Sequence, residues 1–186
     1  MKLGRLPLPR DERDFPMARI LPERQLRTFR YWRRPIVLDQ GDTSTCEGNA
    51  WTAWLADAPV VHPDIDALND PVTAEVYAVE LYEEATGDST LLKGGYTRQF
   101  LKVLQRRGLI GNYYRAASVD EVITCILTTG PVCFGSYWYS SMDRVWTEYG
   151  NAYLRVDEGT TIRGGGAGMT RPGRGTVMLT FTSAML

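Results

Sequence analysis

Hydrophobic positions recur every three or four residues in several parts of the chain, a spacing that predicts amphipathic helices. The first such helix is predicted to begin at Cys46, directly after a polar turn rich in threonine and serine. Asp57 and Pro59 mark its end, because proline cannot continue a helix. The residues expected on its apolar face are Ala50, Ala53 and Trp54.

A second helix is predicted to begin at Pro71. Asn69 and Asp70 precede this proline, and a polar cap followed by proline at the first position is typical of a helix start. The pair Gly87–Asp88 is predicted to stop the helix. The residues expected on its apolar side are Val72, Val76, Val79 and Tyr82.

Two more helices are predicted before the character of the sequence changes. The third spans about residues 96–107, and Gly108 ends it. The fourth runs from Ser118 to about Thr128, because Ser118 and Glu121 have the spacing of a capping box. The residues of the third helix expected to point inward are Phe100, Val103 and Leu104.

Beyond Gly130 the sequence favours strands, which are predicted within 131–139, 151–156 and 176–181. The glycine-rich stretch 160–175 is predicted to be a loop. Because helices come first and strands second, the predicted fold class is α+β with two unequal lobes. The predicted parts are a basic extended arm (1–34), a helical lobe built on the Cys46 helix (35–130) and a shortened β lobe (131–186).

Charge distinguishes the first of these parts from the rest. Residues 1–34 contain ten basic and four acidic residues, a net charge of +6, whereas residues 35–186 contain eleven basic and eighteen acidic residues, a net charge of −7. We expect the basic arm to dock on an acidic surface, either of its own body or of a protein partner. Nucleic acid is not indicated as a partner, because the basic stretch has no recognised binding motif.

No apolar run approaches the roughly 18 residues needed to span a membrane, and the N-terminal residues lack the apolar segment of a secretory signal. Three cysteines, Cys46, Cys125 and Cys133, do not form a disulfide framework. We therefore expect free thiols in a reducing compartment, which means a cytoplasmic or virion-associated protein without a membrane partner. One histidine and three scattered cysteines lack metal-ligand spacing, so no metal or other cofactor is expected.

The candidate chemistry is concentrated in residues 39–54, DQGDTSTCEGNAWTAW. Cys46 lies at a predicted helix start, where the first N–H groups lower the pKa of a thiol and favour the reactive thiolate. Gln40, six residues earlier, can offer its side-chain amide to the oxyanion that develops in acyl transfer. Cys46 is therefore the candidate nucleophile and Gln40 the candidate oxyanion-hole donor.

The pattern Gln-Gly-x-x-x-x-Cys before an aromatic-rich helix resembles the active-site start of papain-like cysteine peptidases. Segments 71–85, 95–110 and 118–142 resemble the bacterial and phage branch of that family, and the similarity extends over about residues 3–155. The resemblance implies a papain-like fold, with a helical lobe and an antiparallel β lobe. Thr43 stands where the family often has the first cysteine of Cys-Gly-Ser-Cys, so that family disulfide is absent.

The general base that this family uses is missing. The family histidine belongs to the β lobe, within Gly-His-Ala, but glycines occupy 164–166 where it is expected, and the Asn-Ser-Trp-Gly segment that carries the orienting asparagine is absent. The single histidine, His62, follows the predicted Cys46 helix. A helix of that size is roughly 18 Å long, so His62 is not expected to reach the thiol.

We therefore expect a papain-like protein that has lost peptidase activity and serves as a binding or structural component, with a phage or prophage assembly as one setting. One alternative is an active cysteine peptidase or amidase in which Cys46 uses an unrecognised base. Carboxylates suit that role poorly, since their charge raises the pKa of a thiol. The carboxylates considered are Asp39, Asp42, Glu47, Asp143, Glu148 and Asp157. Another alternative is an unrelated globular domain in which Cys46 is a small buried residue.

Overall fold

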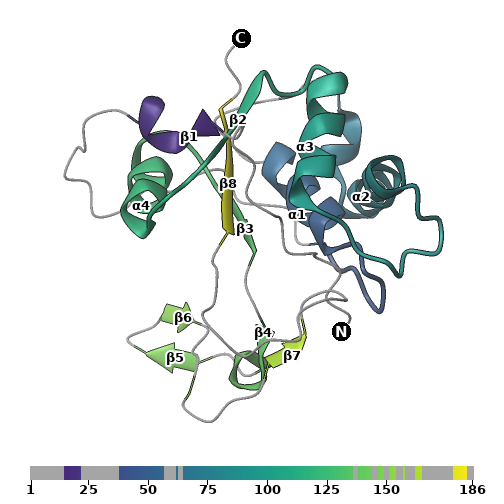
Figure 1. The fold of residues 1–186 in the computed structure, drawn as a ribbon. Helices are drawn as coiled ribbons and strands as arrows, with labels where there is room; N and C mark the ends of the chain where they lie inside the picture. Colours follow the sequence, from purple (N-terminus) through teal and green to yellow (C-terminus); the bar gives the residue numbers. More distant parts are fainter. Residues whose placement is uncertain are drawn as a thin grey trace.

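The computed structural model describes residues 15–21, 38–56, 62, 65–135, 138–143, 146–148, 151–153, 157, 162–164 and 178–183. Within these residues the chain forms four α-helices and several short strands, so the predicted α+β class is confirmed. Three of the helices lie on one side of a four-stranded sheet, and the fourth lies on the other side (Figure 1).

The helices begin and end close to the predicted positions. The α-helices are α1 (Cys46–Ala56), α2 (Pro71–Thr86), α3 (Thr97–Arg106) and α4 (Val119–Thr128). Three short 3-10 helices are η1 (Met17–Arg19), η2 (Asp66–Asn69) and η3 (Ser140–Asp143).

Side chains cap two of these helices as the sequence predicts. Asp70 accepts a hydrogen bond of 2.9 Å from the N–H of Thr73 at the start of α2. Gly87 ends the same helix in the left-handed conformation, with φ at 68°. At α4, Ser118 Oγ accepts from the N–H of Glu121 at 3.2 Å, and the Glu121 carboxylate accepts from the N–H of Ala117 at 2.7 Å. The second half of the capping box therefore reaches one residue further back than predicted.

The buried faces of α1 and α2 differ from the predicted ones. Ala50 on α1 is exposed, and on α2 Val72 is 70% and Val76 56% exposed. Small residues explain the difference, because a Cβ at Gly48 would collide with the carbonyl oxygen of Ala78. The two helices approach so closely that only small side chains fit between them. The buried residues are Gly48, Trp51, Thr52, Trp54, Leu55 and Ala56 on α1 and Ala74, Ala78, Leu81 and Tyr82 on α2.

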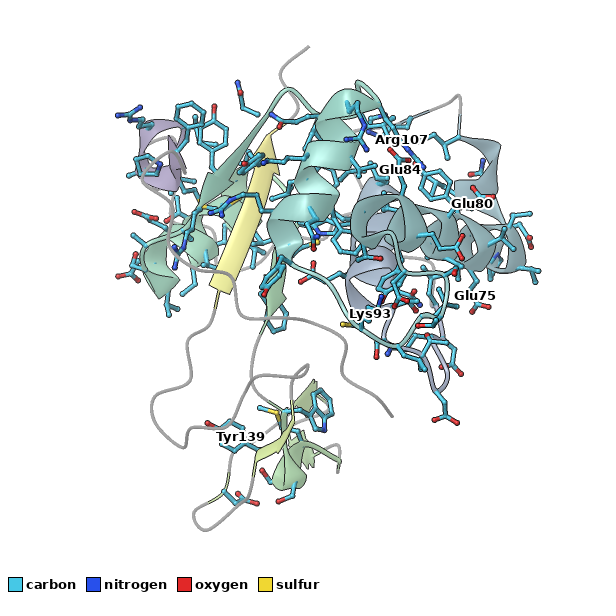
Figure 2. All side chains as sticks on the ribbon, turned by 45° about the vertical axis from the view of Figure 1, so that its right-hand side comes forward. Glu75, Glu80, Glu84, Lys93, Arg107 and Tyr139 are labelled. Atoms are coloured by element: carbon cyan, nitrogen blue, oxygen red, sulfur yellow. The ribbon has the colours of Figure 1, made fainter. Side chains whose placement is uncertain are left out.

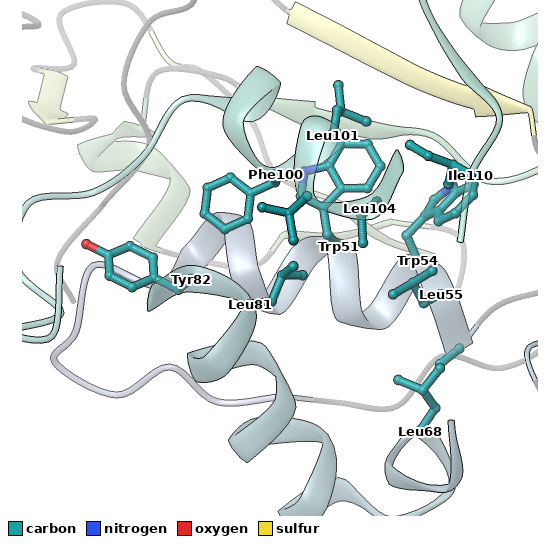
Figure 3. Close-up of a cluster of buried hydrophobic side chains, with 12 residues drawn as sticks. Trp51, Trp54, Leu55, Leu68, Leu81, Tyr82, Phe100, Leu101, Leu104 and Ile110 are labelled. Atoms are coloured by element: carbon teal, nitrogen blue, oxygen red, sulfur yellow. The ribbon is translucent and has the colours of Figure 1, made fainter. Parts of the chain in front are cut away.

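The main hydrophobic core lies between α1, α2 and α3 (Figure 3). Trp51 and Trp54 of α1 meet edge to face, with ring centroids 5.9 Å apart. Phe100 and Leu104 of α3 are fully buried against them, as the sequence predicts for this helix. The core therefore fixes α1, and with it the position of Cys46, against two other helices.

The four-stranded sheet has the strand order β1-β2-β8-β3. β8 is antiparallel to both of its neighbours, and β1 is parallel to β2. The strands are β1 (Phe15–Pro16), β2 (Asn112–Arg115), β3 (Cys133–Gly135) and β8 (Met178–Ser183). They come from all three parts that the sequence delimits, 1–34, 35–130 and 131–186.

The sheet is the middle layer between two apolar clusters, because successive side chains of a strand face opposite sides. Tyr113 and Cys133 pack against the core of α1, α2 and α3. Their neighbours Tyr114 and Val132 pack against a second cluster built on Met17 and the α4 residue Cys125. The sheet thereby holds α4 and η1 on one face and the Cys46 helix on the other.

Four shorter strands form two separate pairs, which lie at the end of β3 away from β2 (Figure 1). β4 (Trp138–Tyr139) pairs with β7 (Ile162–Gly164), and β5 (Trp146–Glu148) pairs with β6 (Asn151–Tyr153). The predicted stretches 131–139, 151–156 and 176–181 thus contain or overlap β3, β4, β6 and β8. Most of the predicted arm and most of the predicted loop 160–175 lie outside the described residues. The loop prediction is wrong at residues 162–164, which form β7 through pairing with β4.

Candidate functional site

Cys46 is the first residue of α1, and its side chain is half-buried. The preceding turn is closed by Gln40, whose carbonyl oxygen accepts from the N–H of Thr43 at 3.2 Å and from the Thr43 hydroxyl at 2.7 Å. The side-chain amide of Gln40 donates to the carbonyl oxygen of Thr43 at 2.8 Å. Gln40 is therefore held at both its backbone and its side chain by the turn that leads to Cys46.

The start of α1 distinguishes between the hypotheses for Cys46. If no helix began at Cys46, the structure would support the hypothesis of an unrelated domain in which Cys46 is a small buried residue. Instead α1 begins at Cys46 itself, and the thiol is partly exposed. The N–H groups of the first helical turn give this position a positive electrostatic potential, which stabilises a nearby negative charge.

Two of the carboxylates nearest to Cys46 in the sequence, Asp39 and Glu47, make hydrogen bonds to the turn, to α2 and to the core. Asp39 accepts from the N–H of Gly41 at 2.9 Å, and its own N–H donates to Glu75 at 3.0 Å. Glu47 is buried, and its two carboxyl oxygens accept from Thr97 and from the indole of Trp51. Asp42 is exposed on the turn. Glu47 therefore connects α1 to α3 inside the core through these hydrogen bonds.

The three other candidate carboxylates, Asp143, Glu148 and Asp157, follow β4 in the chain. Asp143 ends η3 and Glu148 ends β5, but their side chains lie outside the described set. Asp157 donates its N–H to Ser141 Oγ at 3.3 Å.

The loop of residues 88–95 forms one wall beside the Cys46 turn. The N–H of Ser44 donates to the carbonyl oxygen of Leu91 at 2.7 Å, and the Ser44 hydroxyl donates to the carbonyl oxygen of Leu92 at 3.1 Å. Within this loop, Leu92 is an exposed apolar residue, with 54% of its surface accessible. The site therefore has an apolar side chain at its border, next to a turn with polar side chains.

Strand β3 approaches the other side of α1 and runs antiparallel to it. The indole N–H of Trp54 donates to the carbonyl oxygen of Pro131 at 3.0 Å, and the Cys133 thiol donates to the carbonyl oxygen of Ala50 at 3.6 Å. Two strand residues advance about 6.6 Å and four helical residues about 6 Å, so the two elements stay in step. This register brings the end of β3 at Gly135 toward the first turn of α1, where Cys46 lies.

The two positions considered for the catalytic histidine, His62 and Gly164, belong to other parts of the chain than the turn before Cys46. His62 follows Ala56, the last residue of α1, by six residues, and α1 with its eleven residues is roughly 16 Å long. Gly164, the first of the glycines at the expected histidine position, is part of β7 and pairs with Trp138. Residues 165–167 lie outside the described residues.

The other two cysteines differ sharply from Cys46 in their surroundings. Cys125 is fully buried under the sheet, and burial raises the pKa of its thiol to about 12. Cys133 is half-buried and lies on the opposite face of the sheet from Cys125. Cys125 lies inside α4 and Cys133 lies in β3. Among the three cysteines, Cys46 is therefore the one at a helix start.

No group of three or more His, Cys, Asp or Glu side chains in the described ranges is arranged to hold a metal ion. No helix in that part of the chain combines the length and apolar character that crossing a membrane requires.

Sequence reasoning missed two residues that shape this site, Ser44 and Asp88. Asp88 was predicted only as part of a helix stop, yet its buried carboxylate accepts several hydrogen bonds from the loop 88–95. A side chain that binds backbone groups leaves no periodic signal, because its partners are peptide groups present at every position. An aspartate directly after a helix-ending glycine was the one local hint.

No protein-family profile, no curated protein and no solved structure matches this chain. The resemblance to papain-like peptidases therefore rests on the sequence pattern around Gln40 and Cys46.

Proposed function

We propose that this chain is a papain-like protein in which the Cys46 region persists as a binding site for a protein or peptide, while peptidase activity has been lost. One observation carries the proposal: Cys46 begins α1 behind a turn closed by Gln40, whereas the chain's single histidine follows the other end of that helix. In the family that the sequence resembles, the histidine of the β lobe supplies several orders of magnitude in acyl-transfer rate, and glycines occupy its expected place at 164–166.

The borders of the site support an extended peptide as its ligand. Leu92 offers exposed apolar surface in the loop that contacts the polar turn, and β3 approaches the helix from the other side. Peptide ligands combine hydrogen bonds along the main chain with a few apolar side-chain contacts. A ligand with one or two apolar residues flanked by polar backbone contacts therefore fits these borders.

A phage or prophage assembly is the setting we propose, in which the protein is cytoplasmic or virion-associated. The resemblance to the bacterial and phage branch supports this setting. The charge difference between residues 1–34 and 35–186 supports docking of the arm on an acidic surface. An active cysteine peptidase or amidase with an unrecognised base is the second candidate, and the helix-start position of Cys46 favours it.

The decisive experiment compares cleavage and binding in the same protein preparations. Wild type and Cys46→Ala are incubated with a mixture of unmodified peptides, and cleavage is followed by mass spectrometry. We expect no cleavage above the Cys46→Ala background. Cleavage that requires Cys46 would replace the binding proposal with the enzyme.

Binding is measured by selecting a random peptide library against wild type and Cys46→Ala. We expect both proteins to enrich the same peptides, and Leu92→Ser to weaken their binding. Val119→Ser is the matched control, since Val119 is an exposed apolar residue on α4, across the sheet from the site. Equal weakening by both serine variants, or loss of binding in folded Cys46→Ala, would contradict the proposal.

A further inference from the structure

Two consecutive peptide groups connect Asp88 with Ser44, which lies two residues before Cys46. In the first, the N–H of Leu92 donates to Asp88 Oδ2 at 3.1 Å, and the carbonyl oxygen of Leu91 accepts from the N–H of Ser44 at 2.7 Å. In the second, the N–H of Lys93 donates to the same Asp88 oxygen at 3.0 Å, and the carbonyl oxygen of Leu92 accepts from the Ser44 hydroxyl at 3.1 Å. Asp88 and Ser44 thus hold the same chain segment from opposite sides.

The Asp88 carboxylate is fixed by further donors. Thr90 donates both its N–H, at 3.0 Å, and its hydroxyl, at 2.5 Å, to Asp88 Oδ1. The hydroxyl of Tyr82 donates to Oδ2 at 2.8 Å and itself accepts from the N–H of Gly94 at 3.0 Å. Asp88 is 2% exposed, so these donors replace the water that a carboxylate otherwise needs. The loop 88–94 is therefore built around one carboxylate.

The backbone at Leu91 shows that the loop conformation is imposed from outside. Leu91 has a φ of 58°, in the left-handed region that costs a leucine on the order of 1–2 kcal/mol. A non-glycine residue persists there only when its surroundings determine the conformation. Here the surroundings are the Asp88 carboxylate on one side of the peptide groups and Ser44 on the other.

We propose that Asp88 is a positioning residue for Cys46. Its carboxylate holds the loop 88–94 so that the carbonyl groups of Leu91 and Leu92 fix Ser44, and Ser44 in turn fixes the chain that enters α1. The inference rests on Cys46 being the centre of the proposed site, but it does not depend on whether the site binds peptides or cleaves them. A loop that only adds stability would leave the reactivity of Cys46 unchanged in a folded variant.

The test measures the reactivity of Cys46 and the protection of Ser44 in Asp88→Asn. Alkylation by iodoacetamide is followed over pH, and each cysteine is identified from its own proteolytic fragment. We expect the pH midpoint of Cys46 alkylation to rise by roughly half a pH unit, which corresponds to a weakened helix-terminus interaction. Hydrogen exchange at the Ser44 amide should become about tenfold faster, because its acceptor is no longer held.

Cys125 reports whether the variant is folded, since its buried thiol reacts only when the fold opens. Glu84→Gln is the matched control, because Glu84 lies in the last turn of α2 and Asp88 directly follows Gly87, which ends that helix. Glu84 binds Arg106 and Arg107 at the C-terminal end of α3, whereas Lys93 of the loop precedes the N-terminal end of α3 (Figure 2). We expect Glu84→Gln to leave both the Cys46 midpoint and the Ser44 exchange rate unchanged.

A second variant, Ser44→Ala, keeps the test valid if Asp88→Asn exposes Cys125. It removes the hydroxyl contact to Leu92 and leaves the N–H contact to Leu91, so we expect a smaller shift of the Cys46 midpoint in the same direction. The proposal is overturned if the Cys46 midpoint stays at the wild-type value in whichever of these variants keeps Cys125 protected, even if Ser44 exchanges faster. It is also overturned if Glu84→Gln shifts the midpoint equally.

Discussion

Thr97, the first residue of α3, donates its hydroxyl proton to the carboxyl group of Glu47 at a distance of 2.7 Å. The other carboxyl oxygen of Glu47 accepts from the indole of Trp51 at 3.1 Å. Glu47 follows Cys46 directly, so this contact ties the start of the Cys46 helix to the start of α3.

The Glu47–Thr97 contact gives the first prediction. Thr97→Val keeps the shape of the side chain but leaves a buried carboxyl oxygen without its donor, so the free energy of unfolding should fall by about 2 kcal/mol. Urea denaturation measures this loss. Thr97→Ser retains the hydroxyl and should lose less than about 1 kcal/mol. Equal losses for the two variants would show that the methyl group matters more than the hydrogen bond.

The close approach of α1 and α2 gives a second prediction. Gly48→Ala places a methyl group against the carbonyl oxygen of Ala78, so the helices must move apart, and the free energy of unfolding should fall by about 2 kcal/mol. Gly108→Ala is the control, because Gly108 has a φ of 70° and open space around it. That variant should lose only about 1 kcal/mol through backbone strain. A smaller loss for Gly48→Ala than for Gly108→Ala in thermal unfolding would contradict the steric account.

A buried hydroxyl at Thr52 gives a third prediction, in the stabilising direction. Thr52 is fully buried on α1, and its Oγ1 has no hydrogen-bond partner among the described residues. Thr52→Val replaces the hydroxyl with a methyl group of similar size, so the free energy of unfolding should rise by up to about 1 kcal/mol. Thr52→Ser keeps the hydroxyl and removes the methyl, and it should destabilise. Destabilisation by valine as large as that by serine would indicate that the hydroxyl is satisfied in solution.

The Asp88 carboxylate makes stability depend on acidic pH. Hydrogen bonds from the Thr90 hydroxyl and the Lys93 N–H hold the pKa of Asp88 well below its usual range. A lowered pKa means that the stabilisation is complete above the unfolded value of about 3.9 and is lost as the pH falls towards the folded value. Thermal unfolding from neutral pH to about pH 2 should therefore show a falling midpoint, and the fall should be shallower in Asp88→Asn.

The comparison of Asp88→Asn with wild type is needed because another carboxylate acts in the same direction. The hydrogen bond from Arg106 lowers the pKa of Glu84, so Glu84 also contributes to acid sensitivity. Subtracting the two pH curves removes the part due to Glu84. Parallel curves for wild type and Asp88→Asn would mean that Asp88 does not carry the acid dependence.

The buried thiol of Cys125 makes stability depend on alkaline pH. Burial raises its pKa to about 12, so the neutral thiol is the form that the fold accepts. This stabilisation is complete below the unfolded pKa of about 8.5 and is lost as the pH rises towards the folded value. In Cys125→Ala, the free energy of unfolding should fall less as the pH rises above about 8.5 than it does in wild type. Urea denaturation at increasing pH measures this difference. An unchanged alkaline slope would contradict this assignment.

Local patterns predicted the helices well, because caps and glycines act over a few residues. Asp70, Gly87 and Ser118 lie at helix ends as their types indicate. The buried faces of α1 and α2 were predicted only in part, with Trp54 and Tyr82 correct and Val76 wrong, because both helices carry apolar residues on more than one side. The choice between Val76 and Ala78 depends on how close the partner helix comes, which the sequence of one helix does not contain.

The candidate site was predicted only at its centre. Cys46 at the start of α1 follows from the turn residues before it, so that element was accessible to sequence reasoning. The wall formed by Leu91 and Leu92 was not, since backbone carbonyl groups contact Ser44 and any residue type supplies a carbonyl. The strand β2 was also missed, because it is short and takes its place through pairing with β1 and β8, which are distant in the sequence.

The position of β8 between β2 and β3 has a consequence for how the chain reaches its native state. A ribosome delivers β2 and β3 well before residues 178–183, and the two strands then have no direct pairing with each other. The sheet that separates α4 from the Cys46 helix is therefore complete only after β8 has paired with both β2 and β3. Pairing between distant segments is slow relative to the closure of neighbouring helices, so we expect the Cys46 helix and its turn to form before β8 completes the sheet.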